Sequence, residues 1–230
     1  RTGHSITAFT LYSSDGLYGT DDFDSQGALL PTYPQSTLDG KALQPGDVRY
    51  KDLNNDGLID VNDKKYMDEY HSLPSAVYGV QLGAKWKGFG IEALFDGRIG
   101  QSVQLTAGSV YWPLYNDDKN ISMHYYNNRW TPDNQDARYP RLTTLSNGNN
   151  FQGGSDFWVE RADWFKLRSL YLYYSFRSEA LMKARLRELS VFVRGLNLFS
   201  IDRIGIFDPE SISLGYPSVR TVSLGVKCTF

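Results

Sequence analysis

The clearest signal for the fold is the stretch Thr221-Val-Ser-Leu-Gly-Val-Lys-Cys-Thr-Phe230. Apolar residues stand at every second position of this stretch, and the residues between them are small or polar. A period of two is typical of a β-strand that has one dry face and one wet face. The dry face would pack in the core of a soluble β-sandwich or against lipid in a membrane barrel, and this stretch alone fits both.

The same alternation recurs upstream and predicts an all-β chain. The expected strands are residues 5–18, 77–86, 89–98, 164–176, 189–199 and 217–230. Their connections alternate between long and short, which is typical of transmembrane barrels with short periplasmic turns and longer extracellular loops. Six strands cannot close such a barrel and pair all their edges in lipid. We therefore expect the C-terminal strands of a transmembrane antiparallel β-barrel with long extracellular loops, within a longer protein.

Composition agrees with this interpretation and excludes others. The 230 residues carry a net charge of −2 and have a sequence pI of about 5.9, so the basic stripe of a nucleic-acid binder is not expected. Aromatic residues reach 14%, and barrels gather aromatics at both membrane interfaces. The single cysteine, Cys228, excludes an intrachain disulfide. No apolar run of about 18 residues predicts a transmembrane helix, whereas barrel strands give a much weaker hydropathy signal.

The long loop 19–76 contains a calcium-loop pattern at residues 52–63. Oxygen-bearing side chains stand at positions 1, 3 and 5, Gly57 at position 6 and an acid at position 12, as Ca²⁺ loops require. The flanks do not form strong helices, so we expect a lone loop rather than a full EF-hand. The alternative is a Gly/Asn/Asp-rich turn that binds no metal. The expected ligands are Asp52, Asn54, Asp56, the Leu58 carbonyl, Asp60 and Asp63.

No catalytic site is expected, so the chain is predicted not to be an enzyme. The acidic segments at residues 21–24 and 117–118 are interpreted as solvated loop charges, and neither His71 nor His124 has a recognisable nucleophile partner. Aromatic residues also gather in the loop of residues 99–160. They would either stack on sugar rings or form the loop's own small core. This group is Trp112, Tyr115, Tyr125, Tyr126, Trp130, Tyr139, Phe151, Phe157 and Trp158.

Several segments, taken in order, resemble the C-terminal quarter of SusC/RagA-type TonB-dependent transporters. The first is Gly46-Asp-Val-Arg-Tyr-Lys-Asp-Leu-Asn-Asn-Asp-Gly-Leu-Ile-Asp60, which is similar to the family's loop before the late strands. The others are Pro74–Gly79, Trp86–Phe89, Asn128–Pro132, Tyr139–Leu142, Ser155–Arg168, Gly195–Phe199, Asp208–Glu210 and Tyr216–Thr221.

This resemblance implies an outer-membrane importer of oligosaccharides or peptides that works with a SusD-like surface lipoprotein. Energy coupling to TonB would use a part of the protein outside this chain. A strand that ends on Phe230 resembles the signal read by the barrel-assembly machinery. The alternative function is a surface-exposed, calcium-dependent glycan-binding or adhesion module, which a product soluble without detergent would favour.

Overall fold

The computed structural model describes residues 2–105, 121–143, 147–150, 154–183, 185–205, 208–210 and 218–230. The chain divides into two compact units. The first consists of Arg1–Ser72 and Ser102–Glu160, and the second of Leu73–Gln101 and Arg161–Phe230. The expected loop residues 106–120, which include Trp112, Tyr115 and the acidic pair 117–118, lie outside the described residues, as does Phe151.

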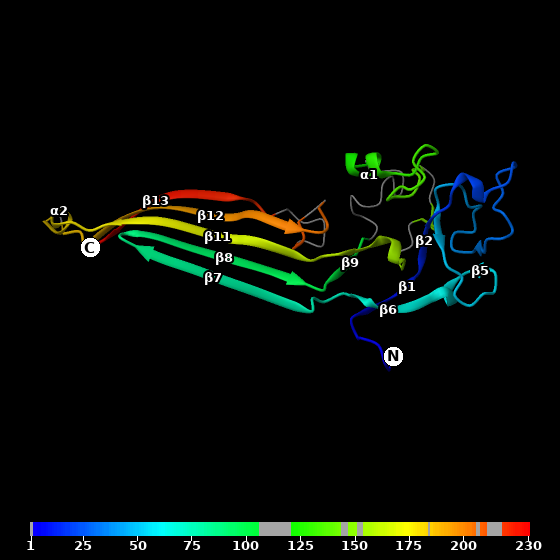
Figure 1. Ribbon diagram of the computed structural model, residues 1–230, viewed down its shortest axis with the longest axis horizontal. Coiled ribbons are helices and arrows are strands. Elements are labelled where there is room, and N and C mark those ends of the chain that lie inside the picture. Colours follow the sequence, from blue (N-terminus) through cyan, green and yellow to red (C-terminus); the bar gives the residue numbers. More distant parts are fainter. Residues whose placement is uncertain are drawn as a thin grey trace. The chain divides into compact units, whose positions relative to one another are not determined.

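The second unit is a five-stranded antiparallel sheet whose strands are neighbours in chain order. Figure 1 shows these long strands lying side by side. All five are about as long as the 9–11 residues that cross a bilayer in a tilted β-strand, or longer. They are β7 (Ala76–Trp86), β8 (Phe89–Ile99), β11 (Trp164–Phe176), β12 (Glu188–Asp202) and β13 (Thr221–Thr229). The all-β barrel-wall fold expected from the alternation is thus confirmed.

Short connections meet at one end of this sheet. Lys87 and Gly88 form the two-residue turn between β7 and β8, and both have positive φ (46° and 92°), as a tight hairpin of this type requires. The connection from β11 to β12 contains the short helix α2 (Glu179–Lys183). Ser175 N–H donates to the Gly88 carbonyl at 2.8 Å, so the two connections lie together.

The first unit is a set of short paired strands. β1 (Ala8–Tyr12) pairs with β6 (Lys64–His71), β2 (Ser14–Leu17) with β4 (Val48–Tyr50), β3 (Gln35–Ser36) with β5 (Leu58–Ile59), and β9 (Ser102–Gln104) with β10 (Val159–Arg161). The helical elements are α1 (Met123–Asn128), η1 (Thr20–Asp22), η2 (Val61–Asp63) and η4 (Asp156–Trp158).

The single barrel strand expected over residues 5–18 is replaced by β1 and β2, which do not join the long sheet. At Ser13 the chain changes partner, because Tyr12 still lies opposite Lys64 whereas Ser14 lies opposite Tyr50. The register of β2 then shifts before Leu17, where Gly16 adopts a φ of +87°. The alternation of apolar and polar residues could not show that the two halves of this segment pair with different strands.

Buried side chains hold the short strands together. Tyr12, Val48, Tyr50 and Ile59 form one core cluster. Leu11, Met67 and Val159 form a second cluster. Burial raises the pKa of the Tyr18 hydroxyl to about 12, and it also raises the pKa of Tyr50. Both side chains are part of the buried core of the unit.

A buried carboxylate joins two distant loop segments of the first unit. The Asp47 side chain is 2% exposed, and its Oδ1 accepts hydrogen bonds from Arg141 Nε at 2.6 Å and Asn150 Nδ2 at 2.9 Å. Asn150 Oδ1 in turn accepts from the Val48 N–H at 2.8 Å. Because a buried charge must be paired, these contacts fix the loop around residue 47 to the loop around residue 150.

Candidate functional site

The long sheet has two chemically different faces, and these are the candidate functional surfaces. Directly paired residues of neighbouring strands share a face, so the register assigns each paired position to one side. Arg168 has no register partner and is assigned by its ion pair with Asp96. A bulge at Arg168 in β11 lets Lys166 and Tyr171 stay on the same face although their numbers differ in parity. We call the face that carries the charges the polar face. Its charged residues within the five strands are Lys85, Glu92, Asp96, Arg98, Lys166, Arg168, Glu188, Arg194, Asp202 and Lys227.

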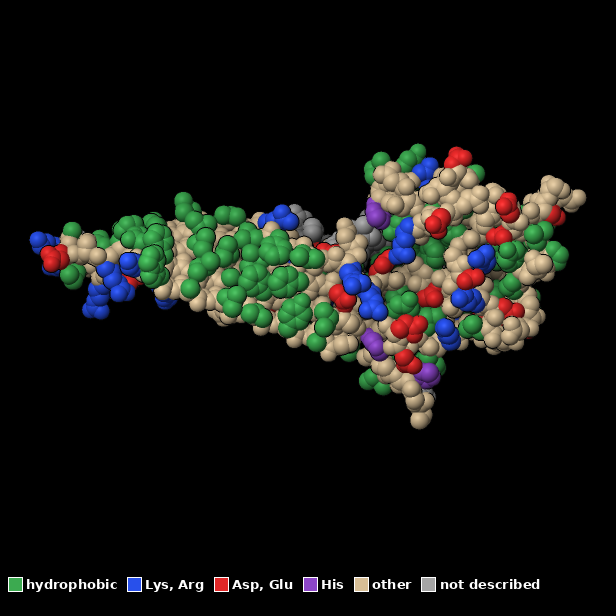
Figure 2. Space-filling view, viewed as in Figure 1, with side chains coloured by type: hydrophobic (Ala, Val, Ile, Leu, Met, Phe, Trp, Pro, Cys, Tyr) green, Lys and Arg blue, Asp and Glu red, His purple; other side chains and the backbone are tan. Residues whose placement is uncertain are grey.

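The opposite face, here called the apolar face, carries none of these charges. Figure 2 shows hydrophobic side chains covering the side of the long sheet that is in view. Many of them are strongly exposed, for example Leu82 at 57% and Leu224 at 81%. An exposed apolar surface of this extent is rare on soluble monomers and marks a surface that a membrane or another protein covers. Its large side chains include Val80, Leu82, Trp86, Phe89, Ile91, Ile99, Leu172, Phe176, Val191, Val193, Phe199, Ile201, Val222, Leu224 and Val226.

Aromatic rings on the apolar face fall into two groups. Tyr174 contacts Phe89 and Phe176 at centroid distances of 4.4 and 4.6 Å, near the end with the short connections. Phe165 contacts Phe95 and Phe199 at 5.5 and 6.3 Å, toward the other end. Phe89 and Phe95 are about 20 Å apart along β8 at the usual strand rise. Two aromatic bands with an aliphatic zone between them are typical of barrel surfaces that cross a bilayer.

On the polar face, two aromatic rings lie over glycines of the neighbouring strands. An added Cβ at Gly90 would be 2.1 Å from the Tyr173 ring, and one at Gly225 would be 2.4 Å from the Phe192 ring. Tyr171 contacts both rings, with centroid distances of 5.2 Å to Tyr173 and 5.3 Å to Phe192. The glycines therefore make room for flat aromatic side chains on a face that is otherwise polar.

Phe230 follows directly after β13. By alternation its side chain continues the apolar row of Val222, Leu224, Val226 and Cys228, and it is 79% exposed. Its expected role as an assembly signal stays a prediction.

The calcium-like loop has well-ordered internal hydrogen bonds. Asp52 accepts from the N–H groups of Asn55 and Gly57 at 2.6 and 2.8 Å. Asp56 accepts from the Leu58 N–H at 2.9 Å. Asn55 and Gly57 have φ of 61° and 83°, so the loop turns sharply at the expected glycine.

The end of this loop is closed by Asp63, which is fully buried. Its two oxygens accept from the N–H groups of Leu53 and Asp60, both at 2.8 Å. Asp60 accepts from the Asn62 N–H and caps η2. In this arrangement the acids face amides, and no three acidic, His or Cys side chains among the described residues are gathered so as to hold a metal. Ca²⁺ would fit only after these carboxylates turn toward a common point.

The loop aromatics that the structure describes are mostly buried. Tyr125 and Trp158 are each 1% exposed, and Tyr139 packs against both rings with centroid distances of 4.1 and 6.2 Å. Trp130 is also buried, and Phe157 packs beside the cluster of Tyr12 and Tyr50. Tyr126 is the exposed exception. These rings form the loop's own core rather than a surface for stacking on sugars.

The predicted loop charges and histidines have local structural partners. Asp22 accepts from the Gly19 N–H and the Tyr33 hydroxyl, and His124 Nε2 lies 3.0 Å from the Tyr139 hydroxyl. His71 lies 3.3 Å from the Thr7 hydroxyl. Within the described residues, none of the helices is long and apolar enough to cross a membrane. The cluster of ionic residues around Lys166 and Glu210 was not predicted from the sequence. Charged residues at alternate positions of β8 and β11 were the signal that could have indicated it.

The open five-stranded sheet with one apolar and one polar face has the geometry of a segment of β-barrel wall. Comparisons with known proteins support this class. No protein-family model matches the chain. TonB-dependent receptor P26 and TonB-dependent receptor P39 of Formosa agariphila are each 24% identical to it, over 99% and 95% of this chain. The chain spans only 23% of the length of each of these relatives.

Solved structures show the same fold. The RagAB peptide transporter matches with a TM-score of 0.64 and 19% identity, over 97% of this chain and 23% of that chain. The RagAB peptide importer in the "open-open" state matches with a TM-score of 0.62 and 19% identity, over 97% of this chain and 22% of that chain. The resemblance to TonB-dependent transporters predicted from the sequence is therefore confirmed, and the fold is that of a segment of their barrel wall.

Proposed function

We propose that this chain forms late barrel strands and extracellular loops of an outer-membrane active transporter that imports oligosaccharides or peptides. The observation that carries the proposal is the separation of the two sheet faces. All the charges of the five strands lie on one face, and the other face is apolar with two aromatic bands. In this proposal the apolar face contacts outer-membrane lipid and the polar face lines the interior.

The remaining strands of the barrel come from outside this chain. β7 and β13 are the two edges of the sheet, and edges cannot stay unpaired in lipid. The similarity to TonB-dependent receptors over 23% of their length supports a longer protein that supplies them. A SusD-like lipoprotein is the proposed partner at the outer surface. The name of the RagAB peptide importer makes peptides a substrate class worth testing beside glycans.

The test uses the full-length protein expressed in the outer membrane of its native cells. We expect it to fractionate with outer-membrane proteins, to need detergent for extraction and to co-purify with a surface lipoprotein. Uptake of a defined oligopeptide mixture and of an oligosaccharide mixture is then compared between wild-type cells, cells lacking the gene and cells lacking TonB. Uptake of one class should disappear in both mutants. A protein that stays soluble without detergent would instead support the calcium-dependent adhesion module.

We also propose that the loop of residues 52–63 binds Ca²⁺ with rearrangement of its carboxylates. The spacing of oxygen donors and the sharp turn at Gly57 support the proposal, since each ionised carboxylate oxygen that accepts an N–H keeps a second lone pair for a cation. Calorimetry with millimolar Ca²⁺ should detect binding that Asp56→Ala weakens and Asp21→Ala leaves unchanged. Absence of heat in the wild-type protein would favour the metal-free turn.

A further inference from the structure

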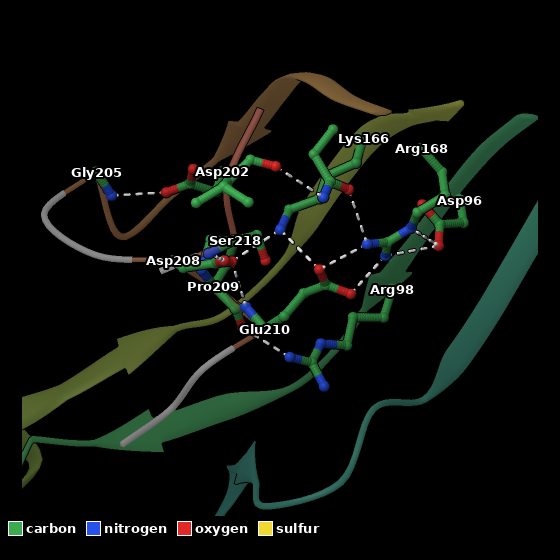
Figure 3. Close-up of polar contacts among 12 residues, drawn as sticks. Asp96, Arg98, Lys166, Arg168, Asp202, Gly205, Asp208, Pro209, Glu210 and Ser218 are labelled. Carbon is green, nitrogen blue, oxygen red and sulfur yellow. Dashed lines mark hydrogen bonds and ion pairs between the residues drawn. The ribbon is translucent and has the colours of Figure 1, made fainter. Parts of the chain in front are cut away.

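The connection between β12 and β13 is tied to the polar face of the sheet by a cluster of ionic residues. Figure 3 shows Asp208 and Glu210 pointing toward Lys166 and Arg168 of β11. Lys166 Nζ lies 2.7 Å from Asp208 Oδ1 and 2.8 Å from Glu210 Oε2. Arg168 bridges Glu210 and Asp96, with nitrogen–oxygen distances of 2.5 and 2.8 Å. The segment of residues 208–210 is therefore bonded to the sheet through both of its acidic side chains.

The backbone of the segment is tied down as well. Arg98 of β8 donates to the Pro209 carbonyl at 2.6 Å. The Ser218 N–H donates to Asp208 Oδ2 at 2.8 Å, which fixes the far side of the connection to the same carboxylate. Segments from β8, β11 and the β12–β13 connection thus meet in one network.

The charges of this cluster balance only when the segment is present. The sheet contributes three cations, Arg98, Lys166 and Arg168, all of which lie within 6 Å of the Trp164 ring centroid. Asp96 is the sheet's own anion in the cluster. Asp208 and Glu210 supply the two further negative charges that neutralise the group. Without them, three cations would lie around one ring with a single carboxylate for compensation.

Burial makes this pairing costly to break. The side chain of Lys166 is 4% exposed and that of Asp208 is 8% exposed. Burial alone would raise the pKa of Asp208, but the hydrogen bonds from Lys166 and Ser218 hold it well below its usual range. The Arg168 hydrogen bonds likewise lower the pKa of Glu210. Removing one partner of a buried ion pair leaves the other charge desolvated and unpaired, which is strongly unfavourable.

We propose that Asp208–Glu210 is a fixed element of the inner wall, clamped over the polar face by Arg98, Lys166 and Arg168. This inference rests on the proposed function, in which the polar face lines the transport passage. At this level of the sheet, a passing substrate meets the clamped segment rather than the bare strands. Asp208–Glu210 therefore narrows the passage as a fixed part of its wall and does not swing as a lid.

The test measures whether the segment shields the Lys166 amine. Full-length protein in detergent is treated briefly with a water-soluble acylating reagent, and modified lysines are quantified by mass spectrometry. We expect Lys166 to be modified at least about tenfold less than the exposed turn residue Lys87, because a buried amine reacts only when its cover opens. In a D208N/E210Q variant the modification of Lys166 should rise at least about fivefold, with Lys87 unchanged.

Asp202→Asn is the matched control. Asp202 precedes the same connection and accepts a local hydrogen bond from the Gly205 N–H at 2.6 Å, and no ion pair joins it to a cation of the cluster among the described residues. It should leave Lys166 protected. Rapid modification of Lys166 in the wild type would overturn the proposal, as would equal protection in D208N/E210Q. The wild-type measurement needs no variant to fold, and it can be made whether or not the protein imports a substrate.

Discussion

At the residue scale, the two faces of β13 should differ in how well they tolerate a charged side chain. Leu224 is 81% exposed on the apolar face, whereas Thr221 lies on the polar face opposite Leu196. An Arg on a lipid-facing position near the bilayer midplane costs about 2–4 kcal/mol, and an interior-facing Arg costs far less. Leu224→Arg should therefore lower the unfolding free energy of the protein in lipid vesicles by about 2–4 kcal/mol. Thr221→Arg is the control and should change it little. Ser223 is a poorer control because it faces Arg194.

Substitutions at two glycines of the first unit can distinguish the cost of backbone strain from the cost of side-chain crowding. Gly46 and Gly57 have nearly equal φ, +86° and +83°. A Cβ at Gly46 would lie 2.6 Å from the Trp130 ring, whereas a Cβ at Gly57 has no neighbour within 4 Å. Gly57→Ala should cost about 1–2 kcal/mol, the left-handed strain alone, and Gly46→Ala should cost more. Limited proteolysis of the loops against temperature would measure both, and equal effects would show that the Trp130 contact does not matter.

At the element scale, the sequence predicted the long strands, because their positions follow from the local alternation of apolar and polar residues. Residues 77–86, 89–98 and 164–176 lie within one residue of the bounds of β7, β8 and β11. The period of two marks β7 and β8 throughout, and in β11 the bulge at Arg168 shifts it by one residue without ending the strand. The short strands of the first unit were missed. β3 and β5 have two residues each, too few for a periodic signal, and their pairing depends on contacts distant in sequence. The clamp was missed for the same reason, since Lys166 and Asp208 meet only through the fold.

The terminal element carries a prediction about assembly. Phe230 is largely exposed after the last strand residue, Thr229, so a purely structural role would let the chain lose it at little cost. If the barrel-assembly machinery reads this aromatic end, deleting Phe230 should sharply reduce the folded protein in the outer membrane. Phe230→Tyr, which keeps the ring, should restore it. Quantitative immunoblots of membrane fractions decide the matter, and wild-type levels after the deletion would remove the proposed signal.

At the scale of the whole molecule, the order of connections predicts which ends of the sheet lie on which side of the membrane. The turn at Lys87 and the connection through α2 are short and share one end of the sheet. The two chain segments of the first unit, 1–72 and 102–160, connect to the sheet at its other end, where β7 begins, β8 ends and β11 begins. Short turns face the periplasm and long loops face the outside in outer-membrane barrels. The first unit should therefore be extracellular.

Cysteine labelling on intact cells tests this orientation. The exposed native cysteine is first removed by Cys228→Ser. Met123, 69% exposed on α1 of the first unit, is a better reporter than Asn149, which is only 3% exposed and hydrogen-bonded to the Val48 carbonyl. Met123→Cys should react with a membrane-impermeant thiol reagent on intact cells. Lys87→Cys should react only after the outer membrane is opened, because the predicted topology places the hairpin turn on the periplasmic side. Labelling of Lys87→Cys but not Met123→Cys on intact cells would invert the orientation.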